Sequence, residues 1–164
     1  DGAAAAGAGA ADGRDLLVAP DDVGRCTDHT LYLLAQYRRD VMTEDDLDAA
    51  RVQSKRAKKG PIDPVLKVGY AGLSCGFCRG RGGGGGGGAP SGRHFPPTAR
   101  ALQASAAKMH GHLARCPRCP PAVRRALEWT RGYHRPQGLP GGPGPFYARV
   151  FDRLRAPAGE GRGR

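Results

Sequence analysis

The sequence has few of the residues that build a large hydrophobic core. Aromatic residues make up only 6% of the chain, and many of the residues in its 39% hydrophobic content are alanines. It has 27 glycines and 14 prolines instead, a composition that favours low-complexity segments. A domain of 164 residues with so weak a core needs additional stabilisation, and a bound metal ion is one way to supply it.

Long apolar runs are also missing. No stretch approaches the roughly 18 consecutive apolar residues that a membrane-spanning helix needs, so we expect no membrane partner. The Ala/Gly-rich start has neither the basic region nor the leucine-rich region of a signal peptide. Five cysteines, an odd number, argue against a fully paired disulfide framework. Cysteines spaced as C-x-x-C near histidines indicate metal ligands in a reducing compartment.

Acidic residues are scarce in the second part of the chain. Residues 51–164 hold 22 Lys and Arg against 4 Asp and Glu, a balance of +18, whereas residues 1–50 have a balance of −7. A strongly basic region attracts polyanions, above all nucleic acid. The alternative is that the acidic front of the chain neutralises the basic part within one molecule.

No arrangement typical of an enzyme is evident. Ser74 has no nearby base in the sequence, and the run of seven glycines from Gly82 to Gly88 lacks the Lys-Ser/Thr of a phosphate-binding loop. The sequence therefore predicts a non-catalytic protein without a small-molecule substrate.

The spacing of apolar residues predicts a small, mainly α fold of the α+β class, with a short β-knuckle and about five helices. The expected helices span residues 28–41, 43–59, 98–114, 121–133 and 146–154, and a short hairpin over 62–73 leads into Cys75. Thr43-x-x-Asp46 resembles a capping box at the start of the second helix.

Composition predicts five segments around a single zinc-stabilised module. They are a disordered Ala/Gly-rich start (1–14), an acidic helical segment that ends in a basic cluster (15–60), a zinc-binding module with a Gly-rich insertion at 82–88 (61–135), a linker and C-terminal helix (136–155), and a disordered tail (156–164).

The candidate zinc ligands allow two closures. In the first, Cys75, Cys78, His112 and Cys116 bind Zn²⁺, because the last two are i and i+4 at the end of a helix and face the same point. In the second, Cys119 replaces His112 and forms a ribbon-like pair of C-x-x-C knuckles. We favour the first closure. His94 is a reserve ligand, His110 is expected to be an exposed helix residue, and Cys26 an isolated thiol.

The basic region predicts a nuclear protein that binds nucleic acid, DNA in preference to RNA, or associates with chromatin. The cluster of Lys55, Arg56, Lys58 and Lys59 has the form of a nuclear-localisation signal. Six arginines around the zinc ligands are candidate phosphate contacts: Arg115, Arg118, Arg124, Arg125, Arg131 and Arg135.

Two other functions remain open. In one, zinc only stabilises the fold and the ligand is a protein partner, bound through the last helix and exposed residues such as Trp129. The other is thiol–disulfide chemistry at Cys75-Gly76-Phe77-Cys78, because a C-x-x-C can lower a thiol pKa. The βαβ context of such redox proteins is missing, which disfavours this function.

From Cys75 to Leu154 the chain resembles a group of uncharacterised Cys/His modules in predicted proteins of microalgae. The matching segments are Gly72-Leu73-Ser74-Cys75-Gly76-Phe77-Cys78, Phe95-Pro96 at the start of a helix, His112-Leu113-Ala114-Arg115-Cys116, and the following Pro120 or Pro121. The seven-glycine insertion and Cys119 depart from that pattern. The resemblance implies zinc at Cys75, Cys78, His112 and Cys116, without an established activity. The spacing C-x2-C-x33-H-x3-C is also loosely similar to BED-type zinc fingers, which bind DNA.

Overall fold

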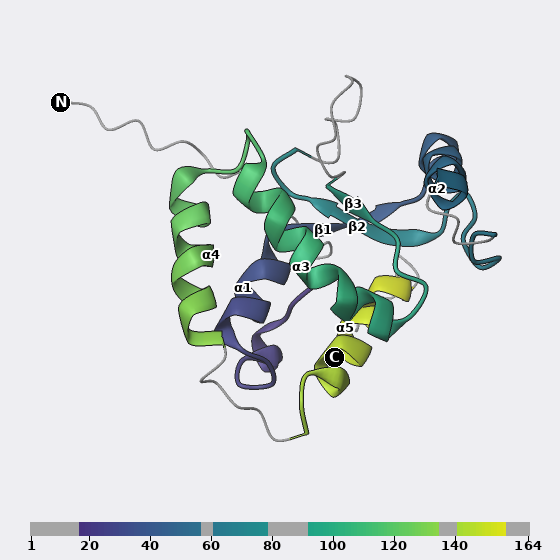
Figure 1. Ribbon diagram of the computed structural model, residues 1–164. Helices are drawn as coiled ribbons and strands as arrows, with labels where there is room; N and C mark the ends of the chain where they lie inside the picture. Colours follow the sequence, from purple (N-terminus) through teal and green to yellow (C-terminus); the bar gives the residue numbers. More distant parts are fainter. Residues whose placement is uncertain (1–16, 57–60, 79–91, 135–140, 157–164) are drawn as a thin grey trace.

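The computed structural model describes residues 17–56, 61–78, 92–134 and 141–156. Five α-helices and a small sheet confirm the predicted mainly α, α+β fold (Figure 1). The helices are α1 (Asp28–Ala35), α2 (Glu44–Arg56), α3 (Ala99–Arg115), α4 (Pro121–His134) and α5 (Gly144–Arg155). The segments predicted to be disordered at 1–14 and after residue 156, and the glycine run 82–88, lie outside the described residues.

The sheet has three antiparallel strands in the order β1 (Tyr37–Val41), β2 (Ala71–Cys75) and β3 (Arg93–His94). β1 pairs with β2 from Tyr37 opposite Cys75 to Val41 opposite Ala71. β3 pairs with the other edge of β2, with Leu73 opposite His94. The central strand therefore ends at the first candidate ligand.

Two sequence predictions of secondary structure were wrong in this region. The helix expected over 28–41 ends at Ala35, because residues 37–41 leave the helix and pair with β2. The hairpin expected over 62–73 does not form: residues 61–70 run through turns, with Gly69 at φ 82, and only residues 71–75 form a strand. In both cases a partner far along the chain decides the backbone conformation.

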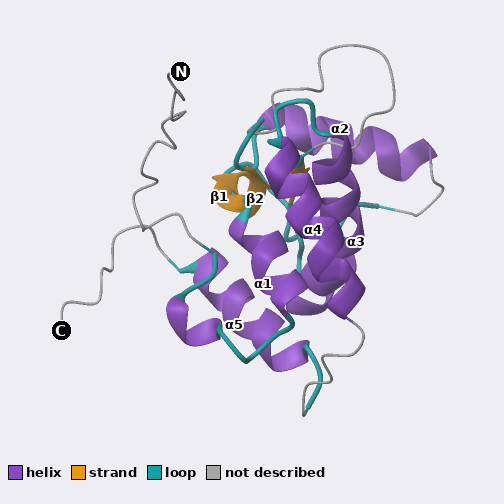
Figure 2. Ribbon diagram, turned by 90° about the vertical axis from the view of Figure 1, so that its left-hand side faces the viewer, coloured by secondary structure: helices purple, strands orange, loops and turns teal. Residues whose placement is uncertain are grey.

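The main core lies between the sheet and the helices. α1 packs against α4 and α3, and α5 packs against α3 and β2 (Figures 1 and 2). Fully buried side chains from α1, β2, α3, α4 and α5 meet there, and they include Leu34, Leu73, Leu102, Met109, Leu113, Leu127, Val150 and Leu154. β1 and α1 belong to the first part of the sequence, so residues on both sides of position 60 share one sheet and one core.

α2 projects at one end of the sheet, far from α4 (Figure 1). Its start carries the predicted reciprocal cap, in which the Thr43 amide donates to Asp46 Oδ2 (2.8 Å) and the Asp46 amide donates to Thr43 Oγ1 (3.4 Å). A second, small cluster of Met42, Leu47 and Tyr70 anchors this end.

A buried ion pair joins the beginning of the described chain to its last helix. Asp22, in a short 3-10 helix (Pro20–Asp22), is completely buried and contacts the guanidinium of Arg153 on α5. The same carboxylate accepts a hydrogen bond from the Ala19 amide at 2.8 Å. Although burial raises the pKa of Asp22, the bonds to Arg153 and Ala19 outweigh it and hold the pKa below 3.8. This carboxylate is therefore charged in the folded protein.

No helix in the described part of the chain is long and apolar enough to cross a membrane.

Candidate metal centre

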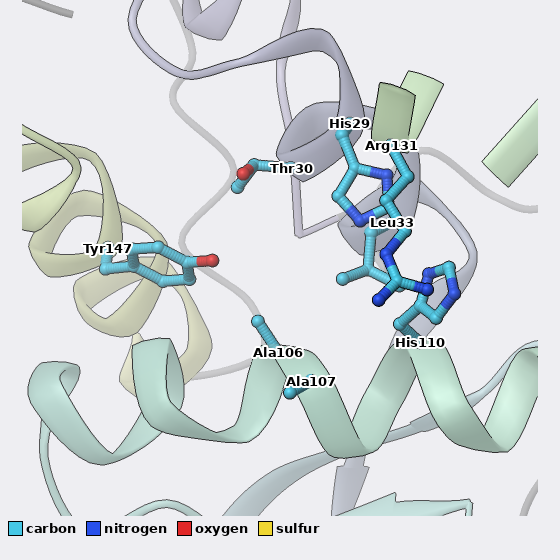
Figure 3. Close-up of a pocket in the computed structure, with 8 residues that line it drawn as sticks. All are labelled: His29, Thr30, Leu33, Ala106, Ala107, His110, Arg131 and Tyr147. Carbon is cyan, nitrogen blue, oxygen red and sulfur yellow. The ribbon is translucent and has the colours of Figure 1, made fainter. Parts of the chain in front are cut away.

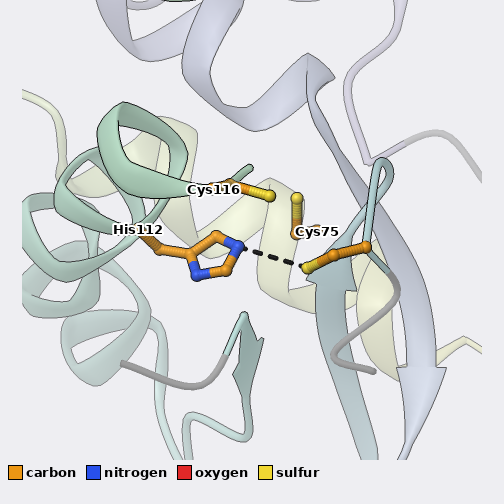
Figure 4. A group of neighbouring side chains, drawn as sticks. Cys75, His112 and Cys116 are labelled. Atoms are coloured by element: carbon orange, nitrogen blue, oxygen red, sulfur yellow. Dashed lines mark hydrogen bonds between the residues drawn. The ribbon is translucent and has the colours of Figure 1, made fainter. Parts of the chain in front are cut away.

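Four buried side chains converge where β2 meets the end of α3. Cys75, Cys78, His112 and Cys116 place their ligand atoms within 4.8 Å of one another, so they can hold a metal ion. Cys78 Sγ lies 3.3 Å from His112 Nε2. Figure 4 shows Cys75 arriving from the strand while His112 and Cys116 arrive from the helix end. Ligands from the two elements thus meet at one point.

The sheet fixes the first pair of ligands. The Cys75 amide donates to the Gly92 carbonyl at 2.8 Å, and the Gly76 amide donates to the Gln36 carbonyl at 2.9 Å. The knuckle that follows Cys75 is therefore held from both sides, by Gln36 just before β1 and by Gly92 just before β3.

The end of α3 fixes the second pair. His112 lies in the last turn and Cys116 is the C-cap residue, where ψ of 117 takes the chain out of the helix. Residues four apart lie on one side of a helix, which brings both ligands to the same face. Pro117 follows immediately and cannot continue the helix hydrogen bonding.

Gly92 is a site residue that the sequence did not reveal. A Cβ at this position would lie 2.7 Å from His112 Nε2, 2.8 Å from His112 Cε1 and 3.1 Å from Cys75 Cβ. Only glycine leaves room for the imidazole to reach the cysteines. The run Gly82 to Gly88 lies just upstream, and nothing in the sequence distinguishes Gly92 from those glycines.

Hydrogen bonds directed at the sulfur lower the pKa of the Cys116 thiol. Burial raises the pKa of Cys116, but the Arg118 amide, the Cys78 side chain, the electrostatic effect of His112 and the Cys119 amide together lower it below 9.0. For Cys75, burial prevails over the amides of Cys78 and Phe77, and its pKa is raised. Amide groups directed at sulfur are the surroundings that stabilise metal-bound thiolates.

Cys119 is buried nearby but is not one of the four converging ligands. Its sulfur lies 3.8 Å from the Pro120 carbonyl oxygen. Burial and the neighbouring Cys116 and Cys75 raise its pKa to about 11. The structure thus brings together the four ligands of the first closure, Cys75, Cys78, His112 and Cys116. Cys119 instead stabilises the turn, because its amide donates to the Cys116 carbonyl at 3.1 Å.

Two histidines near the centre have other environments. His94, the reserve ligand, packs its ring 5.8 Å from that of Tyr37 and is outside the converging group. Burial, with the nearby His112, lowers its pKa to about 4, so it is neutral near pH 7. The prediction that His110 is exposed was wrong: its side chain is only 12% exposed, since its Nε2 contacts Glu128 Oε1 of α4 at 3.0 Å.

The arginines and lysines predicted to bind nucleic acid or to form a localisation signal differ in their exposure and contacts. Arg115, Arg118 and Arg125 are exposed at the end of α3, in the following turn and on α4. Arg124 instead donates to the Cys116 carbonyl at 3.5 Å. Lys55 is exposed near the end of α2, whose last residue is Arg56, while Lys58, Lys59 and Arg135 lie outside the described residues.

Arg131 lines a pocket on a different side of the helices. The pocket lies between α1, α3, α4 and α5 and is lined by His29, Thr30, Leu33, Ala106, Ala107, His110, Arg131 and Tyr147 (Figure 3). The rings of His29 and His110 are 5.3 Å apart. Arg131 also lies 4.0 Å from Glu128, so its charge is partly compensated there.

Comparisons with family models, curated proteins and solved structures gave no match. Neither the resemblance to the microalgal Cys/His modules nor that to BED-type fingers is tested by them.

Proposed function

We propose that this protein is a non-catalytic, zinc-stabilised module that binds nucleic acid. The observation that carries the zinc assignment is the convergence of three thiols and one imidazole. Tetrahedral Zn²⁺ holds sulfur at about 2.3 Å and nitrogen at about 2.0 Å, which separates the two ligand atoms by about 3.5 Å. The 3.3 Å between Cys78 Sγ and His112 Nε2 fits that geometry.

The ligand set is that of a structural site. Cys75, Cys78, Cys116 and His112 supply four protein ligands, which fill a tetrahedral shell and leave no position for a substrate or a reactive water. All four are buried, so the metal joins β2 to α3 from within the core. Bound Zn²⁺ would require thiolates and a neutral imidazole, and its binding energy would add to the stability of the fold.

The distribution of charge supports nucleic acid as the partner. Among the described residues 92–134 there are eight Lys and Arg and a single acid, Glu128. Acidic residues of the first part of the chain pair with arginines elsewhere: Asp40 and Asp46 with Arg93, and Asp21 and Asp22 with α5. The acidic residues of the first part of the chain thus neutralise mainly arginines of β3 and α5.

Exposed arginines remain beside the zinc ligands. Arg115, Arg118 and Arg125 make no ion pair with any acid in the described ranges. The acidic first turn of α2 lies at the other end of the molecule from α4 (Figure 1). A cationic surface on one side, held by a metal-stabilised turn, suits contact with phosphates. With the basic cluster from Lys55, this favours a nuclear protein that binds DNA or associates with chromatin.

The test is binding of the zinc-loaded full chain to a labelled 20-base-pair DNA, followed by fluorescence anisotropy at several salt concentrations. We expect log Kobs to fall linearly with log[salt], with a slope near −0.9 for each phosphate neutralised. Arg118→Gln should weaken binding for all sequences and reduce the slope by about 1. Arg51→Gln removes the same charge from α2, where Arg51 pairs with Asp48, and should change neither quantity.

A different result would contradict the proposal. If neither DNA nor RNA binds at low salt while the protein retains one zinc, nucleic acid is not the ligand. The same arginines and α5 would then be tested for a protein partner, the other function open from the sequence.

A further inference from the structure

We propose that the outer face of α4 binds unpaired nucleotides of a single-stranded nucleic acid, with bases stacked on Trp129 and Tyr133. This rests on the proposed function and names its ligand more closely. Arg125, Trp129 and Tyr133 follow one another at four-residue spacing along one side of the helix, and Arg118 precedes the helix. We refer to these four residues as the aromatic–arginine stripe.

The two aromatic side chains are unusually open to solvent. Trp129 is 67% exposed and Tyr133 is 53% exposed, and their ring centroids lie 5.0 Å apart at an interplanar angle of 54°. The other large apolar side chains exposed in the described ranges are all valines. Neighbouring Gly132 has no heavy atom within 4 Å of the place that a Cβ would take, so space remains beside the rings.

Charge accompanies the rings on the same face. Arg125 is exposed on this face of α4, and the exposed Arg118 lies in the turn that precedes the helix. Glu128, the one acid of α4, directs its carboxylate to His110 at 3.0 Å and to Arg131 at 4.0 Å. The stripe therefore combines open aromatic faces with positive charge, which is the combination that single-stranded nucleic acid requires.

An unpaired strand fits this surface better than a duplex does. In a duplex each base is stacked between its neighbours, so exposed aromatic rings have no base face to contact. Unpaired bases expose their faces, and stacking on Trp or Tyr is available to every base whatever its sequence. A protein partner fits less well, because none of the other large apolar side chains exposed in the described residues belongs to α4.

The chain has one tryptophan, so its fluorescence reports on this face directly. The zinc-loaded full chain is titrated with unstructured single strands of DNA and of RNA, and with a DNA duplex of equal length. We expect Trp129 emission to be quenched by the single strands and not by the duplex. Parallel anisotropy titrations use labelled strands, so that variants without tryptophan can be compared.

The variants separate stacking from charge and from folding. Trp129→Ala should weaken single-strand binding at least about fivefold, the lower end of the effect known for a stacked base. Trp129→Phe keeps a ring and should retain most of the affinity. Both substitutions are at an exposed position, and both proteins should keep one zinc and an unchanged unfolding temperature.

The outcomes distinguish the inference from the function on which it rests. Equal binding of duplex and single strand, with no quenching and no effect of Trp129→Ala, would overturn the stacking surface and leave nucleic-acid binding intact. Absence of binding to every strand would overturn both. A blue shift of Trp129 emission that depends on protein concentration alone would show that the stripe joins two copies of the chain, which also overturns the inference. Quenching by RNA but not DNA, or the reverse, would support it and identify the nucleic acid.

Discussion

Gly92 lies against the imidazole of His112, so closely that a Cβ at Gly92 would be 2.7 Å from Nε2. The same residue accepts the hydrogen bond of the Cys75 amide through its carbonyl. One glycine thus lies between ligands that come from different elements. Because the contact involves the nitrogen that faces Cys78, any side chain here should disturb the four candidate metal ligands.

Gly92→Ala should weaken metal binding at least tenfold, since the imidazole must move away from the cysteines. Competition with a chromophoric chelator gives the affinity, and thermal unfolding gives the stability. Gly132→Ala is the matched control: its Cβ would meet no atom within 4 Å, and alanine should stabilise α4 by up to about 1 kcal/mol. Equal metal affinity in the two variants would contradict the close contact at Gly92.

His112→Ala should lose the zinc, whereas Cys119→Ser should keep it. The reason is that His112 belongs to the converging group and Cys119 does not. Native mass spectrometry of both proteins, purified with zinc present, counts the bound ions. Loss of zinc only in Cys119→Ser would instead select the ribbon-like closure. Absence of zinc from the wild-type protein would remove the metal assignment altogether.

Removal of zinc should unfold the centre and expose its thiols. All five cysteines are buried, and burial with the nearby Asp22 and Asp28 raises the pKa of Cys26 to about 12. A thiol-specific disulfide reagent should therefore react slowly with the zinc-loaded protein and rapidly with all five thiols after a chelator is added. Circular dichroism should show a loss of helix in the same step. Unchanged thiol reactivity and helix content in the zinc-free protein would mean that the fold does not depend on the metal.

Asp22→Asn should destabilise the protein by about 2–4 kcal/mol, because it leaves Arg153 without its buried partner. The side chain of Asp22 is 0% exposed and that of Arg153 is 29% exposed. Asp21→Asn is the control. Asp21 also contacts Arg153, but its side chain is 59% exposed, so it should contribute less than about 1 kcal/mol to the free energy of unfolding. Denaturant unfolding at pH 7 compares the two. A smaller loss in Asp22→Asn than in Asp21→Asn would contradict the importance of the buried pair.

The same pair predicts a pH dependence. The pKa of Asp22 in the folded protein lies below the 3.8 of the unfolded chain, so its charge stabilises the fold above about pH 4. That contribution is lost as the pH falls through the lowered pKa. Wild-type stability should therefore decrease below pH 4 more than that of Asp22→Asn, which has already lost the contribution. Acid also releases zinc from its thiolates, but the two zinc-loaded proteins share the same metal ligands, so the difference between their pH profiles reports on Asp22.

Local patterns were sufficient for several elements and for the ligand set. The capping box at Thr43 and the apolar residues at helical spacing gave α2, α3, α4 and α5 at nearly their observed positions. Cys75 and Cys78 lie in one turn, and His112 and Cys116 lie four apart on a helix, so each pair converges by local geometry alone. These relationships depend on residues close in sequence, and a sequence contains them directly.

Contacts between distant residues decided the rest. The segment 37–41 has apolar and charged residues that suit a continued helix, but β2 (Ala71–Cys75), far along the chain, offers it a strand partner and removes it from α1. The buried side of His110 depends on Glu128 of another helix. The prediction of a helix through residue 41 and the prediction of an exposed His110 were both wrong, because the residues that these groups contact lie far away in the chain.

The sequence by itself determined most of the helices, the group of cysteines and histidine that converges and the excess of positive charge after residue 50, because spacing and composition are properties of neighbouring residues. Only the tertiary structure decided that β1 completes the sheet, that Gly92 makes room for His112, and that Arg124 reaches the carbonyl of Cys116 while Arg125 and Trp129 stay exposed on α4. The physical reason is that burial and close approach are set by the packing of elements against one another, and one element's residues do not specify what will lie against them.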